Sequence, residues 1–164
     1  MEITTDIALK GSAWNKAING LGEFFKGRTN YMIYMISLSI GIIYDKRCDQ
    51  LPYKENEEIR SVPRNVLQNN DNGTLDFMFQ SVILSTMTES FSEEERLNIA
   101  FGEEVEFRKM DLLTEFANFG VLKLVEQITD NEFETMNNIK VFLENTINGY
   151  NFDLNPLEDV LFNE

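Results

Sequence analysis

The sequence predicts an all-α fold, a compact bundle of about six to seven helices in a single domain that covers residues 1–164. Apolar residues recur at spacings of three and four along most of the chain, which is typical of amphipathic helices. No segment sustains the period-two alternation of a strand, so we expect any strands to be short and peripheral. The 43% hydrophobic content, with 13 Phe and 7 Met, is that of a protein with a core.

The N-terminal third predicts two helices. Ser12 is a suitable N-cap for the first, which carries an apolar stripe at helical spacing: Trp14, Ala17, Ile18, Leu21 and Phe25. The second helix begins at Thr29 or Asn30 and contains the apolar stretch 31–44. That stretch is shorter than the roughly 20 residues of a membrane span, so we expect a central buried helix and no membrane anchor.

A long connection is predicted over residues 45–73, with at most one short element at 62–67. Two prolines and an asparagine-rich turn interrupt every helical pattern there. Irregular connections of this length are uncommon in a compact domain and are often functional.

The C-terminal half predicts the remaining helices. The clearest amphipathic pattern follows Thr74, and Ser92–Glu95 forms a capping box that opens a short helix. The next helix is expected to stop at Gly120 and a further one to follow it. Asp130 is the predicted cap of the last long helix, which Gly149 ends.

Residues 150–164 form a tail with its own helical signal. Pro156 suits a helix start, and apolar residues follow at Leu157, Val160 and Leu161. We expect this tail either to dock on the body or to bind a partner.

The composition excludes several classes of chemistry. The chain has no histidine, which removes zincin motifs, imidazole-based triads and most mononuclear metal sites. Cys48 is the only cysteine, so no intramolecular disulfide can form. This cysteine usage and the lack of a secretory signal predict the cytoplasm. We expect no catalytic, cofactor-binding or metal-binding residues, although a carboxylate-bridged metal site stays open.

Charge divides the chain into two unequal halves. Residues 1–64 carry nine Lys or Arg against eight Asp or Glu, whereas residues 65–164 carry five against twenty. Such an acidic half repels phosphate backbones, which disfavours free duplex DNA as a ligand. The acidic partner-binding candidates are Glu93, Glu94, Glu95, Glu103, Glu104 and Glu106.

Basic residues gather instead in the 45–73 connection. The candidate contact residues there are Lys46, Arg47, Arg60 and Arg64. They suit phosphate binding, but ion pairs with the acids of the same connection are the favoured interpretation.

Two stretches together resemble a known family. They are "FFKGRTNYMIYMISLSIGIIYDKR" at 24–47 and "EFANFGVLKL" at 115–124. They are similar to the small accessory proteins of bacterial DNA-phosphorothioation (Dnd-type) and related antiphage restriction systems, which have an apolar helix with a late glycine and a terminal Lys-Arg. Those proteins also have an acid-Tyr-Ala-Asn-Gly-Gly-like segment, in which Ala117, Asn118 and Gly120 agree while Phe116 and Phe119 differ.

The resemblance implies a non-catalytic subunit that assembles with a larger nuclease, ATPase or DNA-binding protein of a defence system. The residues independently favour protein binding through an acidic helical face. Two alternatives remain: an acidic, phage-type DNA mimic that inhibits a nuclease, and a DNA-contacting protein that uses the basic residues of 46–64.

Overall fold

The computed structural model describes residues 4–25, 29–87, 90–102 and 107–149. Within these ranges it confirms an all-α architecture, with one very small antiparallel sheet. The elements in chain order are β1 (Ile7–Leu9), α1 (Ser12–Leu21), α2 (Thr29–Ile43), β2 (Arg60–Val62), α3 (Arg64–Asn70), α4 (Thr74–Thr86), α5 (Glu93–Phe101), α6 (Lys109–Val125) and α7 (Glu132–Ile147). None of the described helices is long and apolar enough to cross a membrane.

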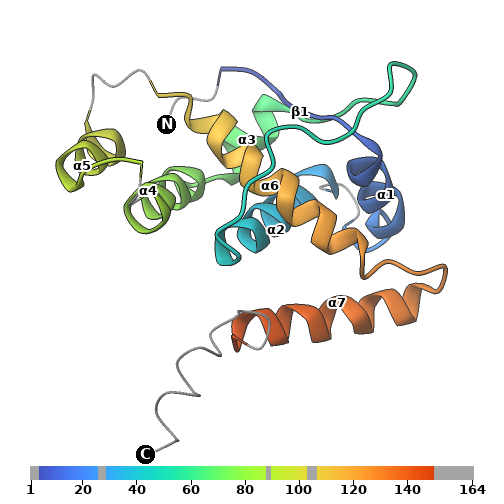
Figure 1. Cartoon of the computed structure of the whole chain (residues 1–164). Helices are drawn as coiled ribbons and strands as arrows, with labels where there is room; N and C mark the ends of the chain where they lie inside the picture. The colour runs from blue at the N-terminus through green and yellow to red at the C-terminus, as the bar shows by residue number, and fades with distance from the viewer. Residues whose placement is uncertain (1–3, 26–28, 88–89, 103–106, 150–164) are drawn as a thin grey trace, which may run out of the picture.

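Helices α2 and α6 pack against each other at the centre of the molecule (Figure 1). Two glycines allow their backbones to touch. A Cβ atom at Gly41 would overlap the carbonyl oxygen of Phe116, and one at Gly120 would overlap the carbonyl oxygen of Ser37. The prediction that a helix stops at Gly120 is therefore wrong, because α6 runs through this residue to Val125 and uses it for close packing.

The 45–73 connection is not one continuous loop. It contains β2 and α3, and its irregular part ends before Arg60. Strand β2 pairs antiparallel with β1 in the register Ile7 with Val62, Ala8 with Ser61 and Leu9 with Arg60. Both strands are short and lie at the periphery, as the sequence predicts (Figure 1).

Helices α4 and α5 form a hairpin on one side of the α2/α6 pair (Figure 1). The predicted capping box of α5 is confirmed, since Ser92 and Glu95 bond each other's main chain. The Arg96 guanidinium donates to the carbonyl oxygen of Leu84 at 2.6 Å, which fixes α5 against α4.

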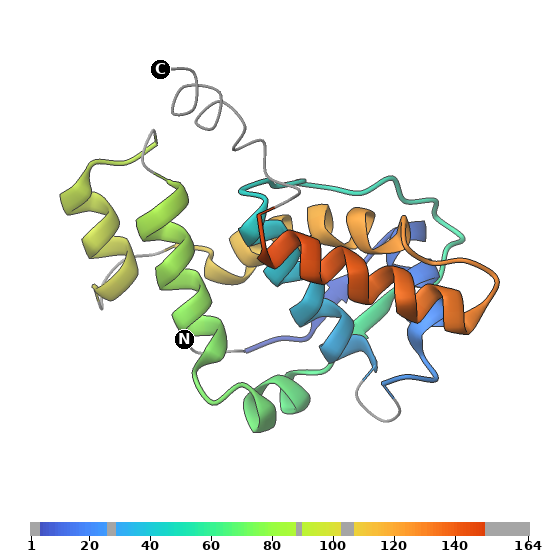
Figure 2. The ribbon, with the colours of Figure 1, turned by 90° about the horizontal axis from the view of Figure 1, so that it is seen from below.

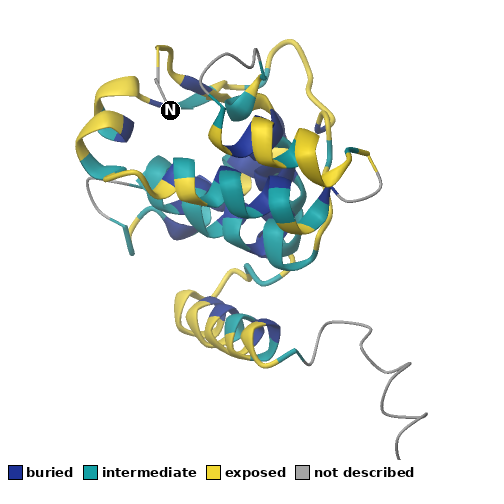
Figure 3. Ribbon diagram, turned by 90° about the vertical axis from the view of Figure 1, so that its left-hand side faces the viewer, coloured by how far each residue is buried: buried dark blue, intermediate teal, exposed yellow. Residues whose placement is uncertain are grey.

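Helix α7 lies across the α2/α6 pair on the side opposite the sheet (Figures 1 and 2). The ring of Phe142 stacks on Tyr44 with centroids 6.5 Å apart. The cap of this helix is Asn131 and not the predicted Asp130, because the Asn131 side chain accepts the N–H of Glu134. Much of its outward face is exposed (Figure 3). The predicted tail at 150–164 lies outside the described residues.

Candidate functional site

The first candidate site is the exposed face of α5. Glu93 and Glu94 are exposed in its first turn, where the positive end of the helix dipole favours carboxylates. Glu95 is held in the cap, and hydrogen bonds from the main chain and the hydroxyl of Ser92 lower its pKa. The other three acidic candidates, Glu103, Glu104 and Glu106, lie outside the described residues.

The same helix exposes large apolar side chains. Leu97 is 46% exposed and Phe101 is 59% exposed. Residues three and four apart share a face of a helix, so these side chains continue the line that Glu93 and Glu94 begin. We call Glu93, Glu94, Leu97 and Phe101 the α5 surface. Its acidic and apolar parts suit a partner that carries both a basic and an apolar group.

The basic candidates lie at opposite ends of α2. Asn30, at the first turn of this helix, donates to the carbonyl oxygen of Ser61 and so places β2 at that end. Lys46 and Arg47 follow the other end, and a helix of 15 residues is about 22 Å long. The four basic side chains therefore do not form one patch.

Three of the basic side chains also have partners within the protein. Arg47 pairs with Glu115 at 3.4 Å and lies 5.9 Å from the ring centroid of Phe116. Arg60 pairs with Glu58 at 2.8 Å. Arg64 donates to the carbonyl oxygen of Thr4 at 3.3 Å. Lys46 is exposed. These contacts favour a structural role for the three arginines.

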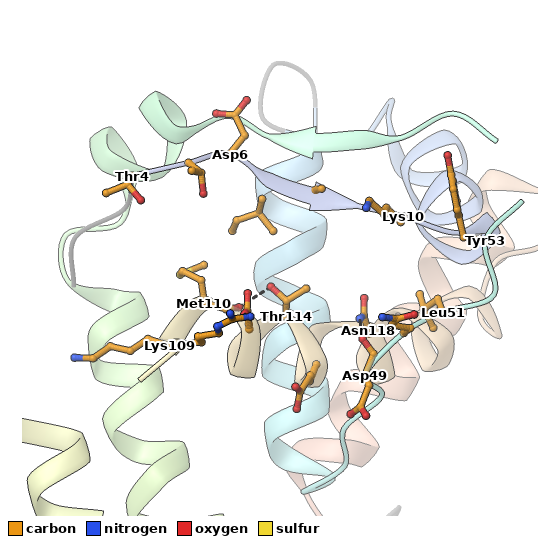
Figure 4. A pocket seen from close by; sticks show the side chains of 17 residues that line it. Thr4, Asp6, Lys10, Asp49, Leu51, Tyr53, Lys109, Met110, Thr114 and Asn118 are labelled. Atoms are coloured by element: carbon orange, nitrogen blue, oxygen red, sulfur yellow. Dashed lines mark hydrogen bonds and ion pairs between the residues drawn. The ribbon is translucent and has the colours of Figure 1, made fainter. Parts of the chain in front are cut away.

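The second candidate site is an open cleft of about 980 Å³ between β1 and α6, which we call the β1–α6 cleft (Figure 4). Strand β1 and the residues before it form one side, and the first half of α6 forms the other. Leu51 and Tyr53, from the irregular connection, close one end. The lining residues are 4–8, 10, 49–51, 53, 108–111, 114, 115 and 118.

Carboxylates gather at the α6 side of the β1–α6 cleft. Partial burial raises the pKa of Glu115, and the nearby Asp49 and Asp111 raise it further, while Arg47 opposes them. Arg108 pairs with Asp111 at 3.5 Å, but both side chains are largely exposed, so this pair neutralises the charge only weakly. Lys109 also lines this side, but its ammonium group pairs with Asp76 at 3.9 Å and lies over the ring of Phe79. Asp49 and Glu115 are consequently the acids of the cleft that can bind a cationic group.

One buried amide fixes the cleft wall. Asn118, 8% exposed, donates to the carbonyl oxygens of Cys48 at 3.1 Å and Asp49 at 3.4 Å. Its own oxygen accepts the indole N–H of Trp14 at 3.0 Å. The N–H of Cys48 in turn donates to the carbonyl oxygen of Glu115 at 2.9 Å. These bonds hold the segment that carries Asp49 against α6.

Sequence reasoning did not find the β1–α6 cleft. Its residues come from three distant segments. The 45–73 connection was singled out for its length and the 115–124 stretch for its resemblance to a family, but nothing in the sequence indicated that they meet beside β1. The resemblance falls on residues that pack α6: Ala117 and Gly120 are buried, and Asn118 makes the bonds above.

Carboxylates of the described residues do not converge on a metal site. No group of three or more Cys, Asp or Glu side chains in the described ranges is arranged to hold a metal ion. The described side chains of the two candidate sites include charged, polar and apolar groups.

Comparison with known proteins identifies no family for this chain. No family model matches the chain, and no curated protein or solved structure is significantly similar to it.

Proposed function

We propose that this protein is a non-catalytic binding subunit that recognises a larger, basic protein through the α5 surface. The observation that carries the proposal is the exposure of Leu97 and Phe101 beside Glu93 and Glu94. Protein interfaces combine apolar anchors, often aromatic, with a charged rim. Charges of one sign on that rim raise the association rate and select partners of the opposite sign.

The resemblance to accessory proteins of antiphage restriction systems suggests the setting. In that setting the partner is a nuclease, an ATPase or a DNA-binding protein, and the complex acts on foreign DNA. The net charge of −14 supports docking on a basic protein and opposes direct binding of a nucleic-acid backbone.

The test is affinity purification of the full chain from its native host, followed by mass spectrometry. The wild type is compared with the double variant Leu97→Ser/Phe101→Ser. The control is Phe133→Ser, which removes an 85% exposed aromatic side chain from α7. We expect the double variant to lose the partner and the control to retain it. Retention by both variants contradicts the proposal.

The charge component has its own test. Glu93→Gln/Glu94→Gln removes both acids of the α5 surface without changing its apolar part. We expect slower association at low salt and a weaker dependence of the affinity on salt. If the captured partner is a nuclease from which DNA displaces this chain, the DNA-mimic alternative replaces the accessory-subunit proposal.

A further inference from the structure

No main-chain group of the described residues pairs with Ala8 on the edge of β1 that faces away from β2. In an antiparallel ladder, pairs that exchange main-chain bonds alternate with pairs that do not. If Ala8 and Ser61 exchanged bonds, the next bonds of the ladder would join residue 6 to Pro63, and proline has no N–H to donate. The main-chain hydrogen bonds between β1 and β2 are therefore made by the two neighbouring pairs, Ile7 with Val62 and Leu9 with Arg60. The carbonyl oxygen of Ser61 accepts instead from Asn30 at 2.7 Å.

The N–H and C=O of Ala8 consequently point away from β2. No third strand among the described residues pairs with β1. In Figure 4, β2 lies on the far side of β1 from the α6 residues that line the cleft. Ala8 itself lines the β1–α6 cleft and is exposed. The unpaired edge thus opens into a cavity that is large enough for several residues of peptide.

The side of the cleft opposite this edge carries charges of both signs, with its acids gathered around Glu115. Asp49 and Asp111 lie near Glu115, and Arg47 offsets the charge on Glu115. Three basic residues also line the cleft: Arg108 pairs with Asp111, Lys109 pairs with Asp76, and Lys10 follows β1. Thr4, Thr5 and Thr114 also line the cleft, although the Thr114 hydroxyl already donates to the carbonyl oxygen of Met110. These groups favour a ligand that combines main-chain hydrogen bonds with a positive side chain.

We infer that the β1–α6 cleft binds an extended segment of a partner protein, which adds to β1 at Ala8 and directs a lysine or arginine toward Asp49 and Glu115. Addition of a strand to an exposed sheet edge is a recurrent mode of peptide recognition, in which the main chain supplies affinity and side-chain pockets supply specificity. The cleft is separate from the α5 surface, so this inference goes beyond the proposed function.

Charge argues against two other occupants. Residues 150–164 of this chain carry four acids and no lysine or arginine, so they have no cationic side chain to offer to Asp49 and Glu115. A second copy of the chain carries a net charge of −14 and is repelled by the first. A basic segment of another protein supplies the cationic side chain and is not repelled by the net negative charge of this chain.

The experiment uses a fluorescein-labelled heptapeptide that alternates threonine and valine around a central lysine. Binding to the full chain is followed by fluorescence anisotropy and by amide chemical shifts. Ala8→Pro removes the unpaired N–H but no ladder bond, and Ala8→Ser is its matched control. A peptide methylated on alternate main-chain nitrogens tests the same bonds without altering the protein. A peptide with a central glutamate, and Asp49→Asn, test the charge.

We expect Ala8→Pro, the methylated peptide and the glutamate peptide each to weaken binding by about tenfold or more, while Ala8→Ser binds like the wild type. Asp49→Asn should weaken binding of the lysine peptide by about threefold, and it should not weaken binding of the glutamate peptide. The largest changes in amide chemical shift on peptide binding should be at Ala8 and Thr114. Absence of saturable binding, equal binding by Ala8→Pro and the wild type, or shifts outside the cleft would overturn the inference.

Two further measurements separate the alternatives. Deletion of 150–164 should leave the amide signals of Ala8 and Thr114 unchanged, and a change would assign the cleft to the chain's own tail. Leu97→Ser/Phe101→Ser should bind the lysine peptide normally. Loss of peptide binding in that variant would show that the two surfaces are not independent and would overturn the inference as stated.

Discussion

The indole N–H of Trp14 donates to the side-chain oxygen of Asn118 at 3.0 Å, and both residues are buried. The amide nitrogen of Asn118 donates in the other direction, to the carbonyl oxygens of Cys48 and Asp49. A single side chain on α6 thereby joins α1 to the wall of the β1–α6 cleft. The bond between Trp14 and Asn118 is buried and the other two are partly buried, so the bonds are costly to remove.

Asn118→Leu should lower the free energy of unfolding by about 3 kcal/mol, because it leaves the Trp14 N–H and two carbonyl oxygens without partners. Urea unfolding followed by Trp14 fluorescence measures this directly, since the chain has one tryptophan. Asn137→Leu, at an exposed position on α7, is the control. A loss below about 1 kcal/mol would show that the network is not structural.

Gly120→Ala should lower the free energy of unfolding by about 3 kcal/mol or more, because the new Cβ meets the main chain of Ser37. Gly20→Ala also adds one methyl group, but this group meets the side chain of Ile128, which can move. The loss of unfolding free energy should therefore be clearly smaller. Thermal unfolding monitored by circular dichroism compares the two. Equal costs would contradict close backbone packing of α2 and α6.

The capping box of α5 predicts a pH-dependent stability. Hydrogen bonds from Ser92 lower the pKa of Glu95, so the folded state favours the ionised carboxylate. Its contribution is present above the ordinary glutamate pKa and is lost as the pH falls through the lowered value. The free energies of unfolding of the wild type and Glu95→Gln, measured between pH 7 and pH 3, should converge as the pH falls. Glu94→Gln controls for the loss of a first-turn charge, and a pH-independent difference would contradict the mechanism.

The charged neighbours of Glu115 predict a change in a measurable pKa. Asp49→Asn should lower the pKa of Glu115, because Asp49 contributes to raising it, and Arg47→Met should raise this pKa. Carbon-detected NMR titration of the Glu115 carboxyl group gives both values. Lys54→Met, in the exposed part of the same connection, is the control. An unchanged pKa in Asp49→Asn would show that the two carboxylates do not interact.

The helices were predictable because their apolar periodicity is a local signal. Of the predicted N-caps Ser92 is confirmed, whereas Gly11 precedes α1 in place of Ser12 and Asn131 caps α7 in place of Asp130. The stretch 31–44 is hydrophobic nearly all round and indeed forms the central helix. Gly120 misled the prediction, because a glycine that permits close packing looks in sequence like one that ends a helix. The strands were too short to show alternation.

The candidate sites were predictable to different degrees. Glu93 and Glu94 lie on an exposed helix start, as the capping box indicates. The basic residues looked like a cluster because they are near in sequence, yet α2 separates them. The β1–α6 cleft depends on β1, on Asp49 and on Glu115, which only the tertiary fold brings together.

The close crossing of α2 and α6 bears on how the chain folds. Helical proteins usually fold quickly, because most of their contacts join residues that are near in sequence. Here the central contact joins Ser37 to Gly120 across most of the described chain, so a large loop must close before the core can form. Refolding should therefore be slower than for a simple up-and-down helical bundle of the same size, and synthesis must pass Gly120 before the centre of the molecule can assemble.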